Sequence, residues 1–148
     1  MKKIILSLGT MLTLAGSTAF ANNNESADAK AKQTFNSNFT GVSHVMWQRE
    51  NAFEKATFTM NNQVMFAYFD DNGDLVATTR NILSDQLPIH LLTDLKKNYA
   101  DHWITELFEI ATQGETTYYV TLENAEETVV LRSSDFNNWN TYKKIKRS

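Results

Sequence analysis

The chain of 148 residues contains no cysteine. No disulfide can therefore support the fold, even in an oxidising compartment where disulfides persist. A thiol nucleophile is excluded, and so is a lipid anchor of the kind attached to an N-terminal cysteine after export. The stability of the protein must come from a packed core instead.

Long hydrophobic runs are also missing, since the main apolar stretch covers only residues 4–15. A membrane anchor needs roughly 20 apolar residues. The stretch follows Met1-Lys2-Lys3 and precedes Ala19-Phe20-Ala21, the small-x-small pattern that signal peptidase cleaves. The sequence therefore predicts a cleavable signal peptide over residues 1–21 and a periplasmic or secreted product without a stable membrane anchor. An uncleaved N-terminal anchor is the alternative.

A surplus of positive charge is absent as well. Removal of residues 1–21 takes away two lysines and no acid, which leaves 12 basic and 17 acidic residues and a formal charge of −5. No nucleic-acid partner is expected, because such a surface needs a basic face. The basic residues 143–147 are interpreted as an edge strand whose lysines discourage edge-to-edge pairing. Residues 22–30 are polar and predict a flexible leader, and residues 31–148 suffice for one domain.

The hydrophobic pattern changes its period along the first half of the chain. Residues 27–39 predict a helix, because Ala31, Phe35 and Phe39 are spaced four apart on one face, and Gly41 ends it. The pairs Asn61-Asn62 and Asn72-Gly73 favour tight hairpin turns. Alternating apolar and polar residues between these turns predict four antiparallel strands, at 43–50, 53–60, 63–69 and 75–80.

A second helix followed by four strands is predicted in the second half. Ser84 or Asp85 is expected to cap this helix, and Pro88 suits its first turn. The helix carries an apolar stripe of Leu91, Leu92, Leu95 and Tyr99. The strands are expected at 104–112, 116–124, 127–134 and, least clearly, 139–146.

The two halves also match residue by residue. With an offset of 64, Ala56-Thr57-Phe58 falls on Val120-Thr121-Leu122. With an offset of 65, Val64-Met65-Phe66 falls on Val129-Val130-Leu131, and Asp70 falls on Asp135. An internal duplication explains these matches economically. The predicted fold class is α+β, with tandem repeats at about 31–82 and 83–148, each a helix packed on one face of a four-stranded antiparallel sheet. The sequence leaves open whether the two sheets are continuous.

Several segments resemble the PepSY-like, β-lactamase-inhibitor-like family of exported bacterial proteins, which is common among Bacteroidetes-type organisms. The segments are Trp47, Ala56-x-Phe58, Asp70-x-x-Gly73-x-Leu75, Leu87-Pro88, Leu95-Lys96-Lys97-x-Tyr99 and Tyr119-Val120-x-Leu122. They cover about residues 30 to 140. The resemblance implies a helix laid against a four-stranded sheet in two copies, and the namesake inhibitor binds an enzyme across its sheet. This chain lacks that inhibitor's disulfides, so lactamase inhibition is not carried over.

One face of the first predicted sheet is too polar for a dry core and too aromatic for a bare surface. It lies opposite the helix and carries Phe53, Phe66 and Tyr68 among Lys55 and threonines. Mixed surfaces of this kind are typical of protein interfaces. In the second half, Tyr119 is expected on the same face together with Val129, Leu131 and Ser133, and Val130 is expected on the other. The partner-binding candidates are Phe53, Phe66, Tyr68 and Tyr119. The alternative is that the sheets or a loop cover this face.

The acidic turn of residues 70–74 resembles a cation-binding loop. Positions six and twelve of a calcium loop need glycine and glutamate, but they hold Leu75 and Asn81 here. The turn is therefore interpreted mainly as a hairpin with solvated carboxylates, and Asp70 and Asp74 are the alternative metal candidates. Three histidines lack a second ligand at the short spacing of zinc sites: His44, His90 and His102. No cofactor is predicted.

Motifs of nucleophilic catalysis are also missing, including Gly-x-Ser-x-Gly. Alternation places Glu106 and Glu109 on opposite strand faces, which counts against an acidic catalytic pair. The chain is therefore predicted not to be an enzyme, and carboxylate catalysis is the hypothesis set aside. The predicted function is an exported, non-catalytic module that binds an unidentified protein or peptide through its helix-free sheet face. The alternative is a periplasmic carrier of a small molecule or cation. The oligomeric state is left open.

Overall fold

The structure is a computed structural model that describes residues 28–147. The predicted signal peptide, residues 1–21, lies outside the described residues, as does most of the predicted leader. The chain runs through a helix, four strands, a short 3₁₀ turn, a second helix and four more strands. None of the helices among the described residues is long and apolar enough to cross a membrane.

The first helix, α1 (Ala29–Asn38), begins two residues later than predicted. The Oδ1 atom of Asp28 accepts a hydrogen bond from the Lys30 amide at 2.8 Å and caps the helix. The predicted leader overlaps the helix, because Ala29 and Lys30 are already helical. Ala31 and Phe35 are buried, as their spacing predicts.

The strands of the first half are β1 (Ser43–Glu50), β2 (Phe53–Met60), β3 (Gln63–Phe69) and β4 (Leu75–Asn81). Asn61 and Asn62 have φ angles of 50° and 63°. This left-handed conformation suits a two-residue turn between antiparallel strands, and asparagine tolerates it well. The predicted strands and their hairpins are confirmed in this half.

The start of the second helix differs from the prediction. Ser84 and Asp85 do not cap it but belong to the 3₁₀ turn η2 (Ser84–Gln86), and α2 (Ile89–Asn98) begins after Pro88. Pro88 disfavours the helical conformation at the preceding residue, and Leu87 has an extended ψ of 149°. A helix started at Ser84 therefore cannot run through this point.

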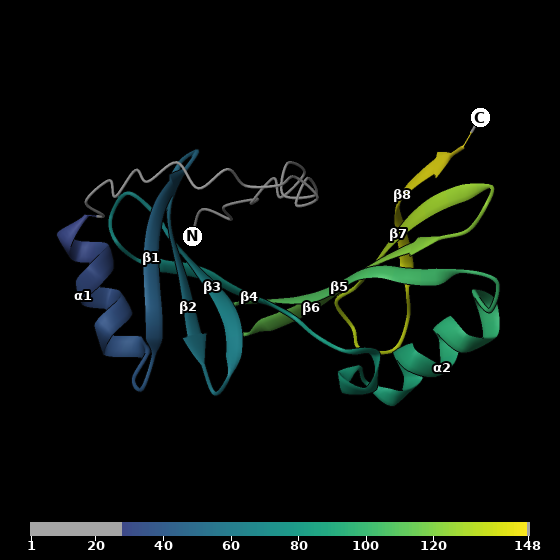
Figure 1. The fold of residues 1–148 in the computed structure, drawn as a ribbon, viewed down its shortest axis with the longest axis horizontal. Helices are drawn as coiled ribbons and strands as arrows, with labels where there is room; N and C mark the ends of the chain where they lie inside the picture. The colour runs from purple at the N-terminus through teal and green to yellow at the C-terminus, as the bar shows by residue number, and fades with distance from the viewer. Residues whose placement is uncertain (1–27, 148) are drawn as a thin grey trace.

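All eight strands form one antiparallel sheet in chain order, so the two halves are continuous. The second half contributes β5 (Trp103–Thr112), β6 (Glu115–Glu123), β7 (Glu127–Ser133) and β8 (Asn140–Lys146). The halves join where β4 pairs with β5, from Thr78 opposite Ala111 to Asn81 opposite Phe108. The register places both helices against the same face of the sheet, at opposite ends of its long axis (Figure 1). We call the opposite side the helix-free face.

Each helix covers its own core. Under α1, the Phe35 ring meets Trp47 and Phe58 edge-on at centroid distances of 5.4 and 5.0 Å. Under α2, the core consists of Leu91, Leu95 and apolar residues of β5, β6 and β7. The indole Nε1 of Trp139 donates a hydrogen bond to the carbonyl of Leu91 at 3.0 Å, which attaches the segment before β8 to this helix.

The turn before β4 packs directly on the first turn of α1. Gly73 has a φ of 81°, and a Cβ atom placed there would lie 2.5 Å from Lys30 Cβ and 2.9 Å from the Ala31 nitrogen. Gly114 has a similar φ of 87°, but a Cβ atom there would meet nothing within 4 Å. Two glycines with the same backbone conformation therefore differ in their surroundings.

We expect Gly73→Ala to destabilise the fold more than Gly114→Ala does. Gly114→Ala should lower the free energy of unfolding by about 1–2 kcal/mol, the cost of a left-handed alanine. Gly73→Ala should lose more, because α1 must also move away from the turn. Urea unfolding of both variants measures the difference, and equal losses would show that α1 does not pack on this turn.

Candidate functional site

The structure brings the four predicted binding residues together. Phe53, Phe66, Tyr68 and Tyr119 belong to one apolar cluster on the helix-free face. Tyr68 and Tyr119 are only 4% and 7% exposed, so they form the floor of this face rather than its outer surface. Burial raises the pKa of both phenols above the ordinary value. Phe53 and Phe66 are half-buried and border the cluster.

The side chains expected on this face from β7 were assigned one position out of register, so that prediction was wrong. Val130 pairs with Thr121 and lies in the helix-free cluster, whereas Val129 and Leu131 lie in the core under α2. Ser133 pairs with Tyr118 on the helix side. A slip of one residue moves every side chain of a strand to the other face. The sequence match of residues 64–66 with 129–131 is therefore out of register in the structure.

An aromatic neighbour that the sequence did not single out extends the cluster. Phe108 stacks on Tyr119 with ring centroids 5.3 Å apart and planes at 10°. The Tyr142 ring meets Tyr119 edge-on at 5.6 Å, and the Arg132 guanidinium lies 6.0 Å from the Tyr119 ring centre. Alternation alone would have placed Phe108 on this face, but only the pairing of β5 with β6 places it against Tyr119.

Lys55 is the buried cation of this face, with 8% of its surface exposed. Its Nζ atom lies 3.0 Å from Glu50 Oε2, and 5.0 and 5.7 Å from the ring centres of Phe66 and Tyr68. A buried ammonium needs such partners, because its desolvation is otherwise unfavourable. Lys55 is thus held in place by a carboxylate and two aromatic rings.

A cavity of about 580 Å³ opens at the centre of the helix-free face. We call it the central cavity. Strands β2 to β5 and the segment after β4 supply its walls. Its principal side chains are Lys55, Phe66, Tyr68, Leu83, Glu106 and Phe108. Leu83 and Ile104, which line it as well, are 70% and 40% exposed, so the described residues leave this part of the face open. Deeper in the face, residues of both halves cover Tyr68 and Tyr119.

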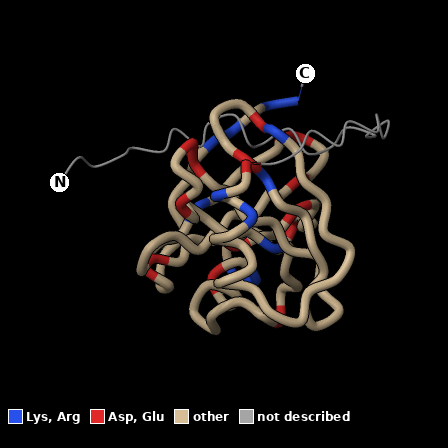
Figure 2. The backbone as a smooth tube through the Cα atoms, turned by 90° about the vertical axis from the view of Figure 1, so that its left-hand side faces the viewer, with Lys and Arg blue, Asp and Glu red and all other residues tan. Residues whose placement is uncertain are grey.

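Charged residues of both signs are interspersed along the chain, as the end-on view of the backbone shows (Figure 2). Ion pairs account for several of the acids, including Glu109, which pairs with Arg80 at 2.5 Å. Glu106 faces the central cavity instead and accepts a hydrogen bond from Thr121 Oγ1 at 3.3 Å. Within residues 28–147, no cationic group lies within 4 Å of its carboxylate. The prediction that Glu106 and Glu109 point to opposite faces is confirmed by the register.

In the acidic turn, the carboxylates of Asp70 and Asp71 contact other groups of the protein. Asp70 Oδ1 accepts hydrogen bonds from the amides of Asn72 and Asp74 at 2.9 and 3.0 Å, and Asp71 pairs with Arg49. Asp74 contributes its backbone amide to this turn. Across the part of the chain that the structure describes, no group of three His, Cys, Asp or Glu residues could hold a metal ion.

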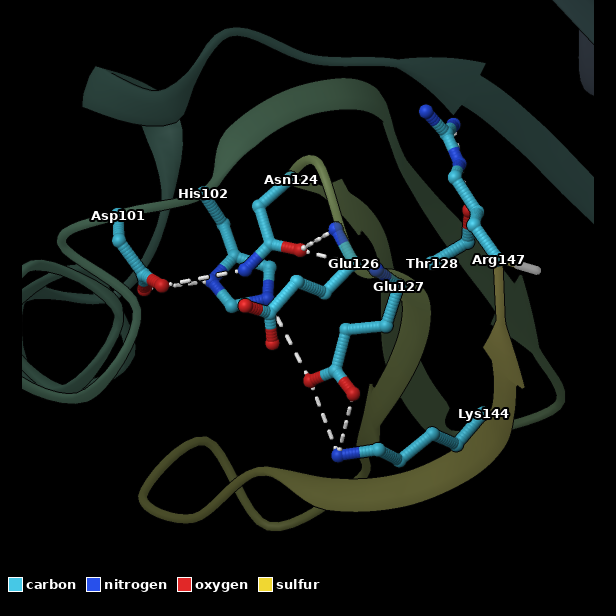
Figure 3. Close-up of polar contacts among 8 residues, drawn as sticks. All are labelled: Asp101, His102, Asn124, Glu126, Glu127, Thr128, Lys144 and Arg147. Atoms are coloured by element: carbon cyan, nitrogen blue, oxygen red, sulfur yellow. Dashed lines mark hydrogen bonds and ion pairs between the residues drawn. The ribbon is translucent and has the colours of Figure 1, made fainter.

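One histidine lies in a polar cluster at the far end of the second half (Figure 3). His102 Nδ1 is 2.8 Å from Asp101, and its Nε2 is 3.7 Å from Glu127. Lys144 Nζ contacts both oxygens of Glu127, at 2.9 and 2.7 Å, and lowers the pKa of that carboxyl. The contact with His102 lowers the pKa of Asp101. The side chain of His102 is 7% exposed, and its buried Nε2 atom has no hydrogen-bond partner among the described residues.

Known structures share this fold. A BLIP-like protein (β-lactamase inhibitory protein-like) from Bacteroides fragilis superimposes with a TM-score of 0.72 at 16% identity, over 82% of this chain and 88% of the other. A DUF2874 family protein from Bacteroides uniformis gives 0.71 at 13% identity, over 81% and 89%. A protein from Bacteroides eggerthii that is proposed to be periplasmic gives 0.71 at 10% identity, over 81% and 88%.

The TM-scores establish a common α+β fold. They support the β-lactamase-inhibitor-like part of the resemblance seen in the sequence. No protein-family model and no curated protein sequence matches the chain. The sequence segments and the three-dimensional fold therefore point to the same architecture.

The turn after β7 provides a test by pH. Asp135 Oδ1 accepts hydrogen bonds from the amides of Asn137 and Asn138 at 3.0 and 2.9 Å, which lower its pKa to about 2. The folded pKa is below the unfolded value of about 4, so the carboxylate stabilises the fold above pH 4. This stabilisation is lost as the pH falls from about 4 to about 2.

We expect Asp135→Asn to be less stable than the wild type near pH 6, and the gap to close as the pH approaches 2. Urea midpoints measured at pH 6, 4, 3 and 2 provide the comparison. Asp85→Asn, at an exposed position in η2, serves as the control and should give a constant difference. A gap for Asp135→Asn that does not change with pH would contradict the role of the charge.

Proposed function

We propose that this chain is an exported, non-catalytic binding module that holds a protein partner on its helix-free face. The observation that carries the proposal is the central cavity, which is lined by buried Tyr68 and half-buried Phe66. Exposed Leu83 and Ile104 form part of its rim. Binding hot spots combine desolvated aromatic residues with an apolar surround. The helices occupy the other face, so nothing in the described chain competes for this one.

Two of the similar structures support the proposal of an exported binding module. One is BLIP-like and another is proposed to be periplasmic, which agrees with the signal-peptide pattern of residues 1–21. One fold can host different functions. The kind of partner is therefore inferred from the residues of the helix-free face and not from the similar structures. The PepSY-like part of the resemblance remains a prediction from the sequence.

We also propose that the domain arose from two tandem repeats, about 31–82 and 83–148. Each half consists of a helix and four strands. The turns at Asp70 and Asp135 share one hydrogen-bond pattern, in which Oδ1 accepts from the amide two residues later and from a second amide beyond it. The hairpin pairing also recurs at an offset of 64, since Ala56 opposite Ala67 in β2 and β3 corresponds to Val120 opposite Leu131 in β6 and β7.

A carrier of small molecules is the second candidate function. The central cavity has a volume of about 580 Å³, within the range of about 300–1,000 Å³ that ligand pockets occupy. It lies on the helix-free face, and the Asp70–Asp74 turn, the cation candidate from the sequence, does not line it. Thermal shift against apolar and ionic ligands separates the two functions, because a small-molecule carrier must be stabilised by a ligand without a protein partner.

Site-specific photo-crosslinking in the native host tests the protein-binding proposal. A benzophenone amino acid at Leu83 should give a discrete crosslinked species, since Leu83 lines the cavity and is 70% exposed. The same amino acid at Ile89, 68% exposed on α2, serves as the matched control and should give none. Adding Phe66→Ala should weaken the Leu83 crosslink several-fold. Equal crosslinking from both positions would refute the proposed face.

Export is tested by the mass of the protein recovered from the host. Cleavage after Ala21 should yield a chain that starts at Asn22, and Ala19→Arg should block processing, because the peptidase needs small residues there. Intact-mass analysis of the periplasmic and extracellular fractions gives the answer. A full-length wild-type chain in these fractions would contradict cleavage.

A further inference from the structure

Glu106 is the charged group of the central cavity that has no cationic partner within 4 Å among residues 28–147. Its carboxylate is half-buried and accepts one hydrogen bond from a hydroxyl group, that of Thr121. The other ion of the cavity, Lys55, is already neutralised by Glu50 at 3.0 Å. Glu50 pairs with Lys55 from outside the cavity lining, so the carboxylate of Glu106 is the lining charge that a cation would complement.

The strand geometry presents Glu106 to the cavity by a local irregularity. The pairing of β5 with β6 shifts between Ile104 and Glu106, so Thr105 is an extra residue that forms a β-bulge. Bulges commonly re-aim a side chain at functional sites. After the bulge, Glu106 faces the helix-free side together with Phe108, two residues further along the strand.

The surroundings of the carboxylate favour a guanidinium over other cations. Phe108 and Phe66 offer partly exposed aromatic rings in the same cavity. A guanidinium is planar, is weakly hydrated, stacks on such rings and matches a carboxylate with two parallel donors, whereas an ammonium is a strongly hydrated point charge. Leu83 and Ile104 provide apolar contacts for a methylene stem.

We infer that the central cavity binds an arginine side chain presented by the protein partner, with its guanidinium on Glu106 and against Phe108. This inference rests on the proposed function and specifies which side chain of the partner occupies the cavity. The partner's arginine restores the charge balance of the cavity, and its stem covers exposed apolar surface on the rim. An arginine that is buried and paired with a carboxylate is typical of interface hot spots.

Titration of the isotope-labelled exported protein with N-acetyl-arginine amide, followed by amide NMR shifts, tests the inference. Saturable shifts should centre on Leu83, Glu106 and Phe108. N-acetyl-citrulline amide has the same shape without the charge and should bind at least about tenfold more weakly, because a hydrogen bond between charged groups is lost. Shifts of equal size with citrulline, or shifts scattered over the surface, would overturn the inference.

Two variants complete the test. Glu106→Gln keeps the acceptor for Thr121 but removes the charge, and it should weaken arginine binding at least about tenfold. Glu115→Gln, an exposed acid at the start of β6, is the matched control and should bind as the wild type does. Well-dispersed amide spectra of both variants establish that they are folded. Unchanged affinity in Glu106→Gln would overturn the inference.

The Leu83 crosslink separates this inference from the proposed function. If the crosslink to the partner persists at wild-type strength in Glu106→Gln, and arginine amide does not bind, the face binds its partner by other contacts and only the arginine inference fails. If no crosslink forms at Leu83 in the wild type, the proposed function fails whatever the arginine titration shows.

Discussion

The structure depends on the pairing of β4 with β5. These strands lie in different halves of the chain, and their backbone hydrogen bonds convert two four-stranded units into one sheet. Because the register is continuous across this junction, α1 and α2 must lie on the same face. A face without helices and a cavity at the junction follow from that constraint.

The aromatic residues of the helix-free face form a third core without a helix. Tyr68 and Tyr119 are buried by their strand neighbours, Phe108 and the apolar residues around them. An open sheet normally leaves one face to water, with polar side chains on it. Here the strong curvature of the sheet lets residues from five strands cover one another, while the rim around Leu83 stays exposed.

Local patterns in the sequence were sufficient to predict the helices and strands, but not the register in which the strands pair. Asn61-Asn62 and the alternation of β2 and β3 predicted the hairpin and both faces, since turn and pattern are encoded by neighbouring residues. The face of Val130 depends on the register of β7, which the repeat alignment placed one residue off. Phe66, Tyr68 and Tyr119 were found from alternation. Alternation also places Glu106 on the face of Phe108, but it cannot show that the carboxylate of Glu106 has a hydroxyl neighbour and no ion pair among the described residues.

The position of Lys55 determines how much ordering is left for a binding event. Its ammonium is fixed between Glu50, Phe66 and Tyr68 before any partner arrives, so the flexible side chain with the most rotamers in the cavity has already lost them during folding. Side chains that become immobile only on association reduce affinity by their lost entropy. The cavity is thus preorganised, and a partner's contacts there should translate into a slow dissociation rate rather than being offset by the ordering of this lysine.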